Sequence, residues 1–104
     1  MKIAEVIGTV TLSRCHASFQ GARLKLLTPL AVTDLGETTA PRNDEIVAWD
    51  QLGTGIGSRV ALAEGPEAAQ PFRPDIKPLD AYVAALLDEV NIDPKSLNSL
   101  NLNQ

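Results

Sequence analysis

Aromatic side chains are scarce in this sequence, since Phe19, Trp49, Phe72 and Tyr82 are the only four among its 104 residues. The chain is nevertheless 44% hydrophobic, so a core must consist mainly of Val, Leu, Ile and Ala. The charged residues, at 21%, are no more frequent than in ordinary globular proteins, which argues against disorder. A chain of this length is expected to form one domain with a modest core.

Cysteine and histidine are nearly absent, with one of each at Cys15 and His16. One cysteine cannot form a disulfide within the chain, and this pair cannot complete a tetrahedral zinc site. The sequence also lacks the run of about 20 apolar residues that a membrane span needs. Glu5 and Gly8 interrupt the place where a signal peptide would have its apolar stretch. We expect a soluble cytoplasmic protein without a metal, a cofactor or a membrane contact.

Basic residues are too few for a typical nucleic-acid-binding protein of this size. Nine Lys and Arg residues stand against thirteen Asp and Glu, and the formal charge is −4. Cationic contacts with phosphates supply most non-specific affinity for nucleic acid, so small binders are normally basic. The charge balance therefore disfavours a nucleic-acid partner.

Four segments have the alternation or the apolar content of β-strands: residues 2–12, 23–32, 45–50 and 59–64. Gly8 predicts a bulge or a bend in the first strand, and Pro29 places the end of the second at an edge or a bend. Leu24 and Leu26 are predicted to point inward, and the third strand is apolar enough for burial on both faces. The intervening loops or turns are predicted at residues 13–21, 33–44 and 52–58. Short strands separated by glycine-containing turns are typical of a small closed or nearly closed barrel.

The pattern changes near the C-terminus. Prolines predict an extended connection before residue 79, after which apolar residues recur with a helical period. The residues on this apolar face are Leu79, Val83, Leu86, Leu87 and Val90. Such a face normally packs on its own domain, so residues 79–90 are predicted to form a helix against the barrel. The sequence predicts one barrel domain with a closing helix over residues 1–94 and a polar, asparagine-rich tail over residues 95–104.

Residues 53–57, G-T-G-I-G, invite comparison with nucleotide-binding loops. The dinucleotide fingerprint requires G-x-G-x-x-G followed by a helix, whereas a strand is predicted after this segment. A tight turn in which neighbouring chains approach closely is the favoured interpretation, because glycine permits both positive φ and close contact.

The sequence gives little support for a catalytic site. Cys15 and His16 are adjacent in sequence, and adjacent residues rarely meet in nucleophile–base geometry. Asp44, Glu45 and Asp50 lie at the ends of a predicted strand, where carboxylates usually only solvate the strand ends. No catalytic residue is therefore predicted, and binding or assembly is the favoured role.

The order of motifs along residues 2–90 resembles the vertex proteins of bacterial microcompartment shells, the EutN/CcmL family. Residues 7–10 (IGTV) resemble that family's G-x-V opening, and residues 21–27 (GARLKLL) its G-x-K/R-L-L-L stretch. Residues 47–57 (VAWDQLGTGIG) are similar to V-A-x-D-x-x-G-A-G-x-G, and residues 78–88 (PLDAYVAALLD) to P-x-D-A-A-I-x-x-I-x-D. The glycine block and the closing segment together make the resemblance fairly specific.

The sequence also departs from the family pattern. Thr54 stands where alanine is usual, and Ser58-Arg59 replaces a common acidic residue. Residues 65–70 lack the usual serine pair and arginine, so a role that this arginine has elsewhere in the family does not carry over to this chain.

The resemblance implies a mainly β fold, a small five-stranded OB-like barrel with one short C-terminal α-helix. It further implies a structural protein without catalytic activity or a cofactor, which forms a homopentamer at the five-fold vertices of a carboxysome-like polyhedral shell. The expected partners are hexameric or pseudohexameric shell proteins, with neither a membrane nor a nucleic acid involved. The expected location is the shell of a microcompartment in the cytoplasm.

Two groups of residues are predicted to make contacts in such an assembly. The residues predicted at the subunit interface or at a central pore are Gly53, Thr54, Gly55, Ile56 and Gly57. The residues predicted on a rim loop facing neighbouring shell proteins are Arg14, Cys15, His16 and Ser18.

Two other functions remain open from the sequence. An OB-type binding module for single-stranded nucleic acid would need a basic stripe combined with exposed rings. The basic residues available for it are Arg14, Arg23, Lys25, Arg42 and Arg59. A small enzyme would have to use Cys15 and His16.

Overall fold

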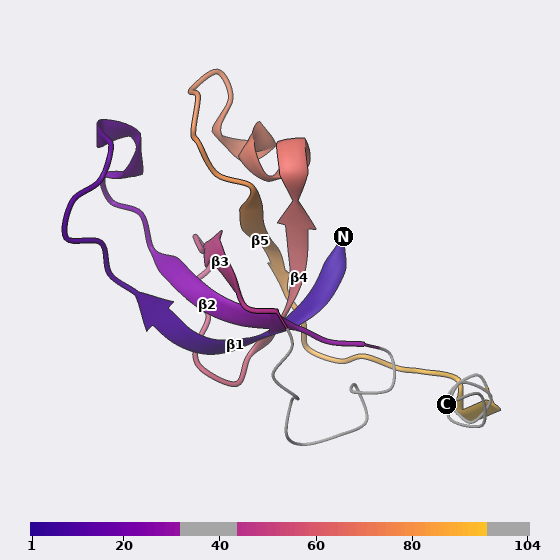
Figure 1. Cartoon of the computed structure of the whole chain (residues 1–104). Coiled ribbons are helices and arrows are strands. Elements are labelled where there is room, and N and C mark those ends of the chain that lie inside the picture. Colours follow the sequence, from indigo (N-terminus) through magenta and orange to yellow (C-terminus); the bar gives the residue numbers. More distant parts are fainter. Residues whose placement is uncertain (32–43, 96–104) are drawn as a thin grey trace.

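The computed structural model describes residues 1–31 and 44–95, and its central feature is a closed barrel of five strands (Figure 1). The strands are β1 (Lys2–Val10), β2 (Leu24–Pro29), β3 (Ile46–Trp49), β4 (Arg59–Glu64) and β5 (Ala81–Leu86). Their order around the barrel is β1-β2-β3-β5-β4, and β4 pairs with β1 to close it. Only β3 and β5 are parallel. The predicted mainly β fold with a five-stranded barrel is confirmed.

The long strand β1 reaches both sides of the barrel. Its first half pairs with β4, and its second half pairs with β2 as far as Val10 opposite Leu24. The register shifts between Val6 and Gly8, where one extra residue is accommodated. A bulge bends a strand and increases its twist, which allows β1 to follow the curvature of a small barrel. The bulge predicted at Gly8 is thus confirmed.

The core is aliphatic, as the composition predicts. Its largest completely buried apolar side chains are Val6, Leu27, Val60, Leu62 and Val83. Leu24 is buried as predicted, but Leu27 rather than Leu26 belongs to the core cluster. The register explains this difference, because Leu27 lies opposite Val6 and Ile46, both of which contribute to that cluster.

The prediction of a helix over residues 79–90 is wrong, because Ala81–Leu86 form the strand β5. Ala81 and Val83 are buried while Leu86 is 54% exposed, so the buried side chains alternate as in a strand. The apolar residues of this segment fit both periods. The barrel decides between them, since β5 supplies hydrogen-bonding partners to β4 and β3 that a helix could not supply.

Two smaller expectations also need correction. The strand β3 is not buried on both faces, because Val47 is 45% exposed while Ala48 and Trp49 are buried. The connection after β4 is not extended throughout, because Gly65–Phe72 forms the 3-10 helix η3. Pro66 lies in the first turn of η3, where a missing backbone N–H does no harm.

Some predictions fall outside the described residues. The loop predicted over residues 33–44 is described only at Asp44, and the tail predicted over residues 95–104 only at Lys95. Pro94 and Lys95 are α-helical. Within the ranges 1–31 and 44–95, no helix has both the length and the apolar character needed to cross a membrane.

Candidate functional site

Asp50, the first residue after β3, fixes the start of residues 52–57, which we call the glycine loop. Its Oδ1 accepts a hydrogen bond of 2.9 Å from the Leu52 N–H. Its Oδ2 accepts bonds of 2.8 Å from both the N–H and the hydroxyl of Thr54. A carboxylate buried without partners would be costly, and these three donors provide the partners. Asp50 therefore does not solvate a strand end as predicted, because it is completely buried.

The far end of the glycine loop joins β1. The Gly57 N–H donates to the Val6 carbonyl at 2.8 Å, and the Val6 N–H donates to the Ser58 carbonyl at 2.9 Å. Gly57 has φ +91° and Gly53 has φ +72°, a left-handed backbone conformation that other residues adopt only with strain. Hydrogen bonds at both ends and two left-handed glycines thus define the path of the loop.

Except for Thr54, the glycine loop faces solvent in the single chain. Ile56 is 74% exposed and Leu52 is 50% exposed. A Cβ atom added to Gly55 would meet nothing within 4 Å, and Gly55 does not have a left-handed φ. The single chain therefore gives no reason for glycine at position 55 or for two large aliphatic side chains in water.

The rim loop, residues 13–20, contains a short 3-10 turn, η1 (Ala17–Phe19), and the four residues predicted to make contacts lie in and around this turn. His16 Nδ1 accepts a hydrogen bond from the Ser18 N–H at 3.1 Å and lies 2.8 Å from Ser18 Oγ. Arg14, Cys15 and His16 are exposed. They border an apolar groove whose lining includes the partly exposed side chains of Leu12 and Val47.

The aromatic residues form one cluster that the sequence did not reveal. Ring centroids are 5.6 Å apart for Phe19 and Trp49, 4.8 Å for Trp49 and Phe72, and 5.6 Å for Phe72 and Tyr82. Lys77 Nζ lies 5.5 Å from the Trp49 ring centroid, a favourable cation–π arrangement. The cluster joins the rim loop, β3, η3 and β5. No local sequence signal could predict it, because its members are far apart along the chain.

Three consecutive residues make three different kinds of contact in this region. The ring of Trp49 packs in the aromatic cluster, and the carboxylate of Asp50 binds the glycine loop. The side-chain amide oxygen Oε1 of Gln51 accepts a hydrogen bond from the Tyr82 hydroxyl of β5. The rim loop and the glycine loop are therefore both attached to the short segment that ends β3.

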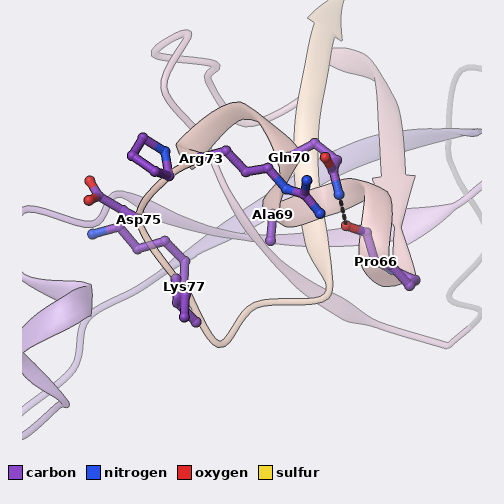
Figure 2. Close-up of a pocket in the computed structure, with 8 residues that line it drawn as sticks. Pro66, Ala69, Gln70, Arg73, Asp75 and Lys77 are labelled. Atoms are coloured by element: carbon purple, nitrogen blue, oxygen red, sulfur yellow. Dashed lines mark hydrogen bonds between the residues drawn. The ribbon is translucent and has the colours of Figure 1, made fainter.

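A separate hollow lies between η3 and the segment that follows it (Figure 2). The Gln70 amide donates to the Pro66 carbonyl across one turn of η3. Arg73, Asp75 and Lys77 also line the hollow (Figure 2). Its lining contains neither a histidine nor a cysteine, and it does not have the arrangement of a nucleophile beside a base.

The other candidate chemical groups are not brought together. Within the described part, no hydrogen bond joins Cys15 to His16, whose Nδ1 is engaged by Ser18. Asp44 and Glu45 are exposed. Across residues 1–31 and 44–95, no group of three or more His, Cys, Asp or Glu side chains could hold a metal ion. Among the described residues, these candidate groups thus do not form a metal-binding cluster or a Cys15–His16 pair.

Comparison with known proteins identifies the family. The family model described as "Ethanolamine utilisation protein EutN/carboxysome" matches residues 1–88 of this chain. The chain belongs to the EutN/CcmL family. This confirms the predicted resemblance, and the match extends across the glycine loop and β5.

Curated EutN/CcmL relatives cover nearly the whole chain. The carboxysome shell vertex protein CcmL of Synechococcus elongatus is 32% identical over 97 residues, which cover 93% of both chains. The bacterial microcompartment shell vertex protein GrpN of Rhodospirillum rubrum is 32% identical over 90 residues, which cover 86% of this chain and 96% of GrpN.

Solved EutN/CcmL structures share the barrel. The CcmL structure from Gloeobacter violaceus matches with a TM-score of 0.78 and 30% identity, covering 89% of this chain and 91% of that one. The GrpN pentameric microcompartment shell protein from Rhodospirillum rubrum matches with a TM-score of 0.75 and 28% identity, covering 89% and 100%. The alternative of a nucleic-acid-binding module gains no support from these relatives.

Proposed function

We propose that this EutN/CcmL chain is a structural subunit that forms a cyclic homopentamer, and that the pentamer occupies the five-fold vertices of a bacterial microcompartment shell in the cytoplasm. The observation that carries the proposal is the match of its barrel to a pentameric microcompartment shell protein over 89% of this chain and the whole of the other. Relatives that are 32% identical are named shell vertex proteins, which supports the same role.

A cyclic pentamer requires a heterologous interface, in which two different surface patches of neighbouring subunits meet. Because the barrel is closed, its strands have their hydrogen-bonding partners within the chain, so side chains and loops rather than strand pairing must supply the contacts. The glycine loop offers Leu52, Gly55 and Ile56 as one patch. The apolar groove beside Leu12 and Val47 offers a recess on a different part of the surface. We assign the patch on the glycine loop to the subunit contact.

The proposed role is geometric. A flat layer of hexagonal tiles cannot close, and pentagonal units at its corners supply the curvature of a polyhedron. In this arrangement the rim loop, with Arg14, Cys15, His16 and Ser18, faces neighbouring hexameric or pseudohexameric shell proteins. Its attachment to the aromatic cluster supports this assignment, because a contact surface benefits from being ordered before it binds.

The subunit is proposed to have no catalytic activity. The relatives named above are shell proteins, and the hollow beside η3 lacks an acid–base or nucleophilic arrangement. Cys15 and His16, the sequence's one candidate pair, are exposed and not hydrogen-bonded to each other in the described part.

The native mass of the purified protein tests this function. A pentamer of 11.1 kDa subunits has a mass of roughly 55 kDa by light scattering. A monomer at all concentrations would overturn the proposal. Mixing the pentamer with a hexameric shell protein then tests the vertex role. Closed particles are expected with it, and only open sheets or tubes without it. Open products in both mixtures would contradict the vertex role while leaving the pentamer intact.

A further inference from the structure

We propose that Asp50 and Thr54 are positioning residues that order the glycine loop before assembly, so that they act on the subunit contact rather than on the barrel. This inference rests on the proposed function, because it assumes that the glycine loop lies in the contact between subunits. The residues that touch the neighbour would be Leu52 and Ile56, while Asp50 and Thr54 hold them in place.

The contacts of Asp50 support this role. Its backbone N–H donates to the Arg23 carbonyl at 2.8 Å, so the residue is itself fixed to the start of β2. Its carboxylate then takes three hydrogen bonds from Leu52 and Thr54. Hydrogen bonds to an ionised acceptor are shorter and stronger than those between neutral groups. Asp50 thus connects the barrel wall directly to the first half of the glycine loop.

The loop needs such a connection because it buries little of its apolar surface. Ile56 and Leu52 are 74% and 50% exposed, and loops with few buried apolar contacts open readily. A loop that is disordered before binding must lose its conformational entropy on association, which weakens the complex. With its polar contacts in place, the loop presents Ile56 in a fixed position before the neighbour arrives.

Substitutions can separate this role from general stability. In Asp50→Asn one carboxylate oxygen becomes an NH2 donor that faces backbone or hydroxyl donors. Thr54→Val removes only the hydroxyl, and Thr54→Ser restores it. Asp75→Asn is the matched control, because it makes the same charge change at an exposed carboxylate.

The experiment measures assembly and local order in the full chain. Sedimentation over a dilution series gives the concentration at which half of the subunits are assembled. We expect Asp50→Asn to raise this concentration by at least about tenfold and Thr54→Val by about threefold. Thr54→Ser and Asp75→Asn should stay within about twofold of the parent. Amide hydrogen exchange should accelerate at Leu52 and Thr54 in Asp50→Asn, with β1 and β4 unchanged.

Two results would overturn the inference. Unchanged assembly of Asp50→Asn would show that the contact does not depend on this order. If amide hydrogen exchange in β1 and β4 accelerated as much as at Leu52 and Thr54, Asp50 would support the barrel as a whole.

Ile56→Asp distinguishes this failure from that of the proposed function, since its side chain is exposed and the subunit should still fold. If Ile56→Asp dissociates the pentamer and Asp50→Asn does not, only the positioning role fails. If Ile56→Asp assembles normally, the glycine loop is not in the subunit contact. Both the place of the loop in that contact and the positioning role of Asp50 and Thr54 are then wrong. A monomeric parent would overturn the pentamer itself.

Discussion

The Lys77 ammonium donates a hydrogen bond of 2.7 Å to the backbone carbonyl of Ser18, which lies 59 residues earlier in the chain. The same ammonium is 5.5 Å and 5.7 Å from the ring centroids of Trp49 and Phe72. One side chain thus binds a loop carbonyl and the faces of two rings. The rim loop and the connection before β5 are therefore in contact at the same end of the barrel (Figure 1).

Lys77→Met keeps most of the aliphatic stem but removes the charge and the hydrogen bond. We expect it to lower the free energy of unfolding by about 1–3 kcal/mol, because both the cation–π contact and the bond to Ser18 are lost. Urea unfolding followed by Trp49 fluorescence measures this change. Lys95→Met, at an exposed position, is the control. A similar loss in both variants would show that the Lys77 contacts contribute nothing.

Gly57→Ala tests the left-handed end of the glycine loop. Its φ of +91° is unfavourable for a residue with a Cβ, so the variant should lose about 1–2 kcal/mol of unfolding free energy. Gly55→Ala should lose much less, since position 55 has neither a left-handed φ nor an atom within 4 Å of the added Cβ. Thermal unfolding of the dissociated subunits compares the two. Equal losses would contradict this account of the loop.

Gly55→Val tests whether the glycine loop meets a neighbour. A Cβ atom added at this position meets nothing within 4 Å in the single chain, so the unfolding of the dissociated subunit should change little. Assembly should be strongest in the parent, weaker in Gly55→Ala and weakest in Gly55→Val, because the volume added to the contact grows in that order. Sedimentation over a dilution series measures this change. A native mass equal to that of the parent at every concentration would remove Gly55 from the interface.

Val83→Ala and Leu86→Ala distinguish strand from helix over residues 81–86. In β5, Val83 is buried and Leu86 is 54% exposed, whereas the predicted helix would have buried both. Val83→Ala should therefore cost about 2 kcal/mol of unfolding free energy. Leu86→Ala should cost about 0.5 kcal/mol or less. Urea unfolding at one fixed protein concentration gives both values, and comparable losses would favour the helical arrangement.

Local sequence patterns predicted the elements whose structure is decided locally. The strand predicted at residues 59–64 has the bounds of β4, and the bulge at Gly8 lies where the register shifts. Residues 81–86 were predicted wrongly because their apolar positions fit two periods. The choice between these periods is made by backbone hydrogen bonds to β3 and β4, which are distant in sequence.

In the candidate site, too, local sequence patterns predict some features, while others depend on residues distant in sequence. Residues 53–57 stand out in the sequence, and left-handed glycines at 53 and 57 account for part of the pattern. Their place in a subunit contact stays a prediction. Asp50 had a detectable signal, because an aspartate often binds the backbone two residues later, but its burial depends on the folded barrel. Thr54 stands where alanine is usual in the family. Its hydroxyl donates a hydrogen bond to the Asp50 carboxylate, which an alanine could not do.

The three neighbours Trp49, Asp50 and Gln51 limit how this chain can change in length. Each makes a different contact, so inserting or deleting one residue among them would move at least one of these contacts out of register. A designer who grafts a new rim loop or a new glycine loop onto the barrel should therefore cut outside residues 49–51 and transfer the tripeptide whole.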